Sequence, residues 1–181
     1  MAELFNPSDT KYDSQGAATL FPAGTYYLAA AGFVRKKGQK EPHTPYIDVK
    51  FVAVGGEYHG KSFWFSVMLS GQMLRKLAHW CRAVGVTEAF DIGSDAEIAD
   101  RLLSREFKAQ VTVDQPGPNA PRGARPRNYI RIFEPLSDAD KAEVASIIGR
   151  LGDPLAEDAG GDARPSPDDG GSAVDSGDVP F

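Results

Sequence analysis

Cysteine, histidine and long apolar runs are scarce in this sequence of 181 residues. Cys81 is the only cysteine, so no disulfide can form within the chain. The three histidines are scattered, and none has the spacing of a zinc site. No run of about 18 apolar residues occurs, which excludes a transmembrane helix. The first residues also lack a signal-peptide pattern. We therefore expect a cytoplasmic protein.

Signatures of catalysis are missing as well. The sequence has neither a phosphate-binding loop nor a Gly-x-Ser-x-Gly elbow. Asp48, Glu57 and His59 could be combined into a nuclease cluster, but acids on strands and turns are commonplace. We expect no enzymatic activity, no cofactor and no metal.

Negative charge is distributed unevenly along the chain, whose net charge is −5. Residues 153–181 hold eight acidic side chains and one basic side chain, whereas residues 1–152 hold 17 acidic and 19 basic ones. Residues 153–181 also have few large apolar side chains, so they cannot bury enough surface to offset the entropy lost on ordering. The sequence predicts a mildly basic body and a disordered acidic tail.

Alternating apolar residues predict five β-strands in the body. The expected strands cover residues 25–34, 46–54, 62–69, 107–113 and 129–134. In the second strand, the predicted core face comprises Ile47, Val49, Phe51 and Ala53. Its opposite face comprises Tyr46, Asp48 and Lys50. Alternation also groups Phe33 with Tyr27 and Ala29 in the first strand. In the fifth strand it separates Ile130 and Ile132 from Tyr129, Arg131 and Phe133.

Three helices are expected beside these strands. The first has the helical spacing of Leu74, Leu77, Ala78, Cys81 and Val84. Ser94 and Glu97 form a capping-box pattern at the start of the second helix, which runs through Leu103. Ser137 caps the last helix, whose predicted buried stripe comprises Val144, Ile147, Ile148 and Leu151.

The order of these elements is three strands, helices, two strands and one helix. It predicts a mainly β fold, a five-stranded OB-like barrel with accessory helices. Other five-stranded barrels and α+β sandwiches have the same order. The expected organisation is an N-terminal arm over 1–20, the OB-like domain over 21–152 and the disordered tail over 153–181.

Basic and aromatic residues are interleaved in the body, as in proteins that bind single-stranded DNA through phosphates and base stacking. The candidate DNA-binding residues are Arg35, Lys36, Lys37, Lys40, Tyr46, Lys50, Lys61, Trp64, Arg122, Arg125, Arg127, Tyr129 and Arg131. Four other aromatic residues are expected to pack in the core: Phe51, Phe63, Phe65 and Phe107.

The chain ends in Asp178-Val179-Pro180-Phe181. Proline restricts the backbone, the phenyl ring can fill a pocket, and nearby carboxylates can meet Lys or Arg around that pocket. This tail resembles that of bacterial single-stranded DNA-binding proteins, which end in acids followed by Ile-Pro-Phe or a similar tip. The resemblance implies a docking peptide for replication, recombination and repair proteins. Its candidate partner-binding residues are Asp175, Asp178, Val179, Pro180 and Phe181.

The body is similar to a family of phage and prophage proteins assigned as OB-type single-stranded DNA-binding proteins. The similar segments are 21–26, Lys37-Gly38 leading to Tyr46, the turn at 56–61, and 128–130. They imply a fold more than a binding site, because glycines fix the turns. The tetramer of longer cellular relatives does not carry over, although a homo-oligomer is possible.

Two functions follow from the sequence. The first is sequence-independent coating of single-stranded DNA in replication, recombination or repair, with partner proteins recruited by the tip. The alternative is a protein–protein adaptor whose OB-like barrel binds no DNA. Affinity for single strands distinguishes the two.

Overall fold

Five strands and three helices make up the part of the chain that the computed structural model describes, residues 19–38, 43–71, 74–118 and 124–156. The strands are β1 (Gly24–Lys37), β2 (Pro45–Ala53), β3 (Ser62–Met68), β4 (Glu106–Asp114) and β5 (Arg127–Glu134). The helices are α2 (Leu74–Ala83), α3 (Asp95–Leu102) and α4 (Asp138–Leu151). None of these helices is long and apolar enough to span a membrane.

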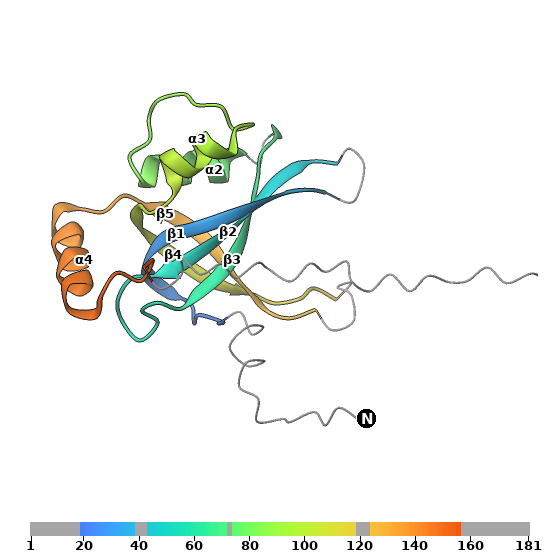
Figure 1. Cartoon of the computed structure of the whole chain (residues 1–181). Helices are drawn as coiled ribbons and strands as arrows, with labels where there is room; N and C mark the ends of the chain where they lie inside the picture. Colours follow the sequence, from blue (N-terminus) through green and yellow to red (C-terminus); the bar gives the residue numbers. More distant parts are fainter. Residues whose placement is uncertain (1–18, 39–42, 72–73, 119–123, 157–181) are drawn as a thin grey trace, which may run out of the picture. The chain divides into compact units, whose positions relative to one another are not determined.

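The strands form one antiparallel sheet in the order β3-β2-β1-β4-β5 (Figure 1). The prediction of a mainly β fold is therefore confirmed. Within the described residues no hydrogen-bonded ladder joins the two edge strands, β3 and β5. Their side chains nevertheless meet, because the ring centroid of Phe65 lies 5.5 Å from that of Tyr129 and 6.2 Å from that of Phe133.

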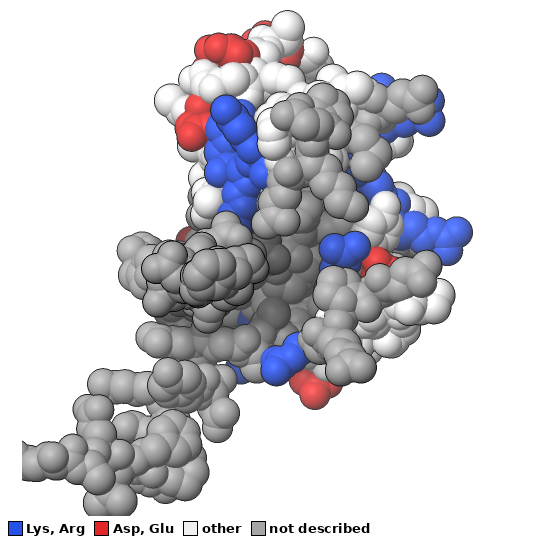
Figure 2. Space-filling model, turned by 90° about the vertical axis from the view of Figure 1, so that its right-hand side faces the viewer, with Lys and Arg blue, Asp and Glu red and all other residues white. Residues whose placement is uncertain are grey.

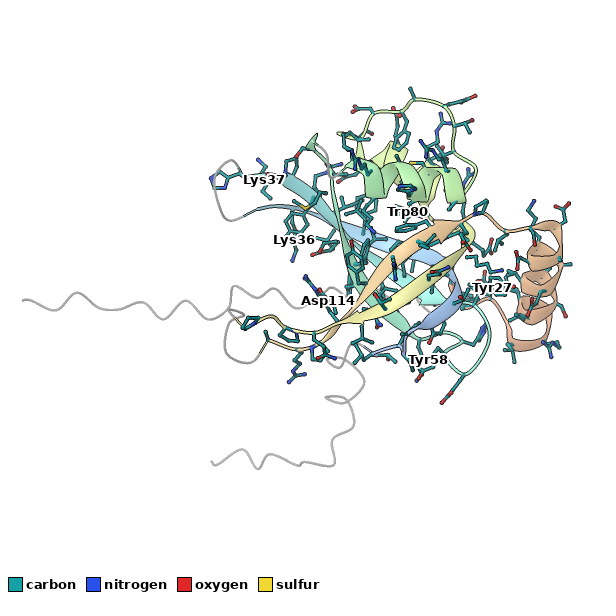
Figure 3. All side chains as sticks on the ribbon, turned by 180° about the vertical axis from the view of Figure 1, so that it is seen from behind. Tyr27, Lys36, Lys37, Tyr58, Trp80 and Asp114 are labelled. Atoms are coloured by element: carbon teal, nitrogen blue, oxygen red, sulfur yellow. The ribbon has the colours of Figure 1, made fainter. Side chains whose placement is uncertain are left out.

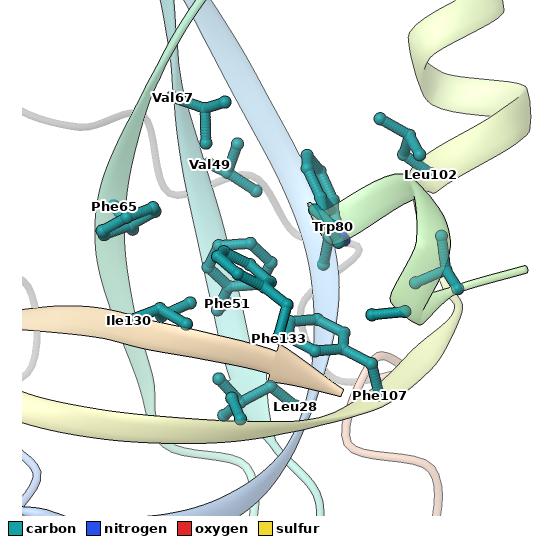
Figure 4. Close-up of a cluster of buried hydrophobic side chains, with 14 of the residues drawn as sticks. Leu28, Val49, Phe51, Phe65, Val67, Trp80, Leu102, Phe107, Ile130 and Phe133 are labelled. Atoms are coloured by element: carbon teal, nitrogen blue, oxygen red, sulfur yellow. The ribbon is translucent and has the colours of Figure 1, made fainter. Parts of the chain in front are cut away.

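The core lies on the inner face of this sheet, where α2 and α3 cover it. Phe51 is at its centre, and its ring centroid lies 5.3 Å from that of Trp80 and 5.5 Å from that of Phe107 (Figure 4). Ile98 and Leu102 of α3 are fully buried in the same cluster. The four phenylalanines expected in the core, Phe51, Phe63, Phe65 and Phe107, are all buried, which confirms that prediction.

A β-bulge in β1 changes the side on which its later residues lie. Ala30 pairs with Phe51 and Gly32 pairs with Lys50, so Ala31 is an extra residue. Phe33 consequently packs against the main core. The prediction that placed Phe33 with Tyr27 and Ala29 is wrong, because strict alternation takes no account of the extra residue.

A second bulge has the same effect in β5. Ile130 pairs with Val111 and Ile132 pairs with Gln110, which leaves Arg131 as the extra residue. As a result Phe133 is buried and Ile132 is 38% exposed. The predicted faces of β5 are wrong from Arg131 onward for this reason.

Two helix stripes also differ from prediction. In α2 the fully buried residue is Trp80, whereas Ala78 is exposed. In α4, Val144 and Ile147 are buried as expected, but Leu151 is 55% exposed. Periodicity identified the helices but not their rotation about their own axes.

Helix α4 packs on the other side of the sheet. Val144 and Ile147 cover Ala29 and Val54. A capping box at Ser137 and Asp140 starts the helix and confirms the predicted cap. Residues 153–156, which the sequence placed in the tail, continue the fold, and Leu155 packs against this second cluster.

Asp140 also fastens α4 to β1. The Tyr27 hydroxyl donates to Asp140 Oδ1 at 2.7 Å and lies 2.9 Å from Glu143 Oε2. Lys108 Nζ lies 3.2 Å from Asp140 Oδ1. Hydrogen bonds from Ser137 and Tyr27 hold the pKa of Asp140 well below its usual range. The bond to Asp140 raises the pKa of Tyr27.

Phe21, in the segment before β1, is joined to β5 through Asn128. The Phe21 N–H donates to Asn128 Oδ1 at 2.8 Å, and Asn128 Nδ2 donates to the Phe21 carbonyl at 2.7 Å. Both residues are buried. The Phe21 ring packs against Tyr26, Tyr58 and Phe63, which fill this end of the core.

Gly55 is required by both its conformation and its surroundings. Its φ is +91°, and a Cβ there would lie 2.7 Å from Ile147 Cδ1. Gly56 has a φ of +66° but no neighbour within 4 Å of such a Cβ.

We expect Gly55→Ala to lower the free energy of unfolding by about 1–3 kcal/mol more than Gly56→Ala, because only the former overpacks the α4 contact. Urea unfolding of both variants measures this, and equal losses would contradict the contact.

Asp140→Asn tests the attachment of α4. A carboxylate with a lowered pKa stabilises the fold above its ordinary pKa, and this stabilisation is lost as the pH falls. We expect the variant to melt below wild type at pH 7 and the difference to narrow below a pH of about 4. Asp138→Asn, in the same helical turn and fully exposed, is the control. A difference independent of pH would argue against the ionised contact.

Candidate nucleic-acid interface

Nine residues of β1, β2 and β3 form a regular array on the side of the sheet opposite the core, here called the outer face. Their neighbours along each strand, such as Val49 and Phe65, point into the core. The register places them in three rows across the strands. These rows are Gly32, Lys50 and Trp64; Val34, Asp48 and Ser66; and Lys36, Tyr46 and Met68. Helix α4 covers the sheet only beside the first row, where it packs on Ala29.

Four of the predicted DNA-binding residues therefore come together on the outer face. Lys36, Tyr46, Lys50 and Trp64 lie on three adjacent strands, and all four are half-buried. Lys50 and Trp64 are direct cross-strand partners, as are Lys36 and Tyr46. Each cation thus lies beside an aromatic ring, which is the combination that unpaired nucleotides require.

A buried carboxylate lies in the middle row of this face. Asp48 is 0% exposed, and the Ser66 hydroxyl donates to its Oδ1 at 2.5 Å. Lys36 Nζ lies 3.7 Å from Asp48 Oδ2. A buried carboxylate is stable only when it is paired, so Asp48 holds Lys36 and Ser66 in place. The sequence placed Asp48 on this face correctly, but its complete burial depends on contacts between strands.

Two hairpins extend from the sheet on the same side of the molecule. The β1–β2 hairpin carries Lys36 and Lys37, and the β4–β5 hairpin carries Asp114, on the side away from Tyr27 and α4 (Figure 3). Figure 2 views the side toward which both hairpins point in Figure 1. Among the described residues drawn there, Lys and Arg side chains lie on several parts of this side, and a group of Asp and Glu side chains lies at the top.

Arg35 has a different environment from its neighbours Lys36 and Lys37. Its cross-strand partner is Ile47, a core residue, because the bulge at Ala31 turns it away from the outer face. Arg35 Nε donates to Asp95 Oδ1 at 2.6 Å, and Nη2 donates to the Ile92 carbonyl at 2.9 Å. The structure thus places Arg35 between β1 and the start of α3 and leaves Lys37 exposed.

The predicted residues of β5 lie at the seam between the edge strands. Lys76 Nζ is 4.5 Å from the ring centroid of Tyr129 and also donates to the Ile130 carbonyl at 2.9 Å. One face of the Tyr129 ring is therefore occupied by Lys76. Arg131 is exposed at the bulge, and Arg127 lies 3.4 Å from Asp114.

The remaining candidates are peripheral or lie outside the described residues. Lys61 is exposed just before β3, and Arg125 is exposed before β5. The candidates that fall outside the described residues are Lys40, Arg122, Asp175, Asp178, Val179, Pro180 and Phe181.

Three residues of this region were not predicted. Ser66 is two residues from Trp64 in β3, so alternation could have placed it on the same face. Gly32 required knowledge of the bulge. Lys76 lies on a helix, and no local pattern links it to Tyr129.

The outer face shows no arrangement for metal chemistry. No group of three or more His, Cys, Asp or Glu within the described ranges could hold a metal ion. His59 has a structural contact, because its Nδ1 accepts the Gly55 N–H at 2.9 Å in the turn before β3.

The sequence matches no protein-family model, and no curated protein is significantly similar to it.

Arg35 and Lys37 allow a test of their different environments. Arg35→Gln removes the ion pair to Asp95 and weakens the attachment of α3. We expect it to lower the free energy of unfolding by about 1 kcal/mol. Lys37→Gln removes the same charge from an exposed position and should change stability by less than about 0.5 kcal/mol. Chemical denaturation of both proteins provides the comparison, and equal stability of the two variants would contradict the difference.

Proposed function

We propose that this protein binds single-stranded DNA without sequence preference and coats it in replication, recombination or repair. The observation that carries the proposal is the outer face. Lys36 and Lys50 lie beside Tyr46 and Trp64, respectively, in register on adjacent strands. Phosphates meet the two cations, and bases stack on the two aromatic side chains.

The proposal includes a fold of the OB kind, a five-stranded and partly open barrel. The strand order supports it, since β1 lies at the centre of the sheet between β2 and β4. The approach of Phe65 to Tyr129 brings the two edge strands near each other. In such barrels the second and third strands and the adjoining loops bind oligonucleotides, and here these are the strands that carry Tyr46, Lys50 and Trp64.

The absence of sequence preference follows from the chemistry of this surface. Lysine contacts phosphates as a point charge, and every base has a ring face on which an aromatic side chain can stack. The one carboxylate of the array, Asp48, is already bonded to Ser66. Reading of base edges therefore has little part in recognition.

Recruitment of other proteins by Val179-Pro180-Phe181 is the second half of the proposal. Its support is the sequence of the chain end, where an apolar tip follows acidic residues. A short docking peptide suits weak and reversible recruitment.

A titration with oligo-dT tests DNA binding. Trp64 is the reporter because Trp80 is fully buried in the core. We expect Trp64 fluorescence to be quenched at low salt and affinity to fall steeply with added salt. Trp64→Ala should weaken binding by about 1–3 kcal/mol, and Trp64→Phe should weaken it less.

Charge variants supply the matched control. Lys50→Gln removes the phosphate contact proposed in the first row and should reduce the slope of log K against log salt by about 0.7. Arg82→Gln, an exposed change on α2, which covers the opposite face of the sheet, should leave the slope unchanged. A wild-type protein without affinity for single strands would overturn the proposal. Partner capture that depends on Phe181 would then favour the adaptor function.

A further inference from the structure

Gly32 directly follows the bulge in β1. Glycine inside a strand is unfavourable relative to alanine by about 0.5–1 kcal/mol. The φ of Gly32 lies outside the left-handed region that only glycine adopts readily. A Cβ built on Gly32 meets no atom within 4 Å. Neither backbone conformation nor packing therefore excludes a side chain here.

The bulge at Ala31 places Gly32 on the outer face, in the same row as Lys50 and Trp64. Neighbouring strands lie about 4.8 Å apart, so Gly32 and Trp64 are about 10 Å apart with Lys50 between them. Glycine in a strand interior often marks a place where a ligand approaches the backbone closely. The missing side chain leaves open space at one end of a row that has a cation in its middle and an aromatic ring at its other end.

We propose that Gly32 is the binding position for an unpaired nucleotide base, next to the base that stacks on Trp64. The nucleic-acid strand crosses β3, β2 and β1 along this row. Lys50 meets the phosphate between the two nucleotides, and the second base occupies the space over Gly32. This inference rests on the proposed function and adds a binding position and a path for the strand.

The environment of the row supports a nucleic-acid occupant. Lys36 lies further along β1 on the same outer face, so the nucleic-acid strand that leaves Gly32 remains near a lysine. Helix α4 ends the open surface on the other side, where it covers Ala29.

A graded substitution series at this position tests the inference. Wild type, Gly32→Ala and Gly32→Val are titrated with fluorescein-labelled oligo-dT by anisotropy, and their thermal midpoints are recorded. Valine suits a strand, so the fold should be retained while the space over Gly32 is filled. We expect Gly32→Val to bind about tenfold more weakly and Gly32→Ala to lie between it and wild type. Val34→Ile adds bulk one row away and should bind within about twofold of wild type.

The outcomes separate the inference from the proposed function. If Gly32→Val binds like wild type while Trp64→Ala binds more weakly, the position over Gly32 is wrong and DNA binding stands. An equal loss in Val34→Ile would also overturn it, because any added bulk would then suffice. If wild type does not bind oligo-dT, the proposed function fails. If Gly32→Val melts at a lower temperature than wild type, the affinities of Gly32→Ala and Gly32→Ser for oligo-dT decide instead. Unchanged affinity in both variants would overturn the proposed base-binding position over Gly32.

Discussion

One extra residue in β1, Ala31, determines which side chains of the β1–β2 hairpin meet the core and which meet the outer face. Before it, Leu28 and Ala30 point into the core. After it, Phe33 points into the core, whereas Gly32, Val34 and Lys36 lie on the outer face. Without the bulge the hairpin would present Phe33 to solvent and turn Lys36 toward the protein interior. The surface on which the proposed function depends is therefore a consequence of a single backbone irregularity.

The same constraint divides the basic residues into two groups. Arg35 points toward α3, where its bonds to Asp95 and the Ile92 carbonyl hold the helix against the sheet. Lys36, one residue later, lies on the opposite side beside Asp48. Successive residues of a strand point to opposite faces. One cation of a consecutive run therefore makes contacts within the fold, and the next lies on the surface. The charge of such a run overstates the charge available to a ligand.

Much of the fold could be predicted from the sequence, because its strands alternate clearly over most of their length. Ile47, Val49 and Phe51 are buried as their spacing requires, and Ser137 caps α4. The two bulges could not be predicted, since an extra residue at Ala31 or Arg131 leaves no local pattern. All residues beyond such a point then change sides.

The candidate site was predictable to a similar extent and for similar reasons. Tyr46, Lys50 and Trp64 were selected from residue type and alternation, and the register brings them onto one face. Contacts between elements that are distant in sequence gave no such signal. The position of Lys76 over Tyr129 and the burial of Asp48 among Ser66 and Lys36 arise only when strands and helices pack.

The paired hydrogen bonds between Phe21 and Asn128 have a consequence for biosynthesis. They join residues 107 positions apart, so the end of the core that Phe21 fills cannot be completed until the ribosome has released β5. Until then Phe21, Tyr26 and Phe63 lack a partner strand that shields them from solvent. Pairings of such long range slow folding, and apolar surface exposed in the meantime promotes aggregation. The end of the core that Phe21 fills is therefore completed only late in synthesis.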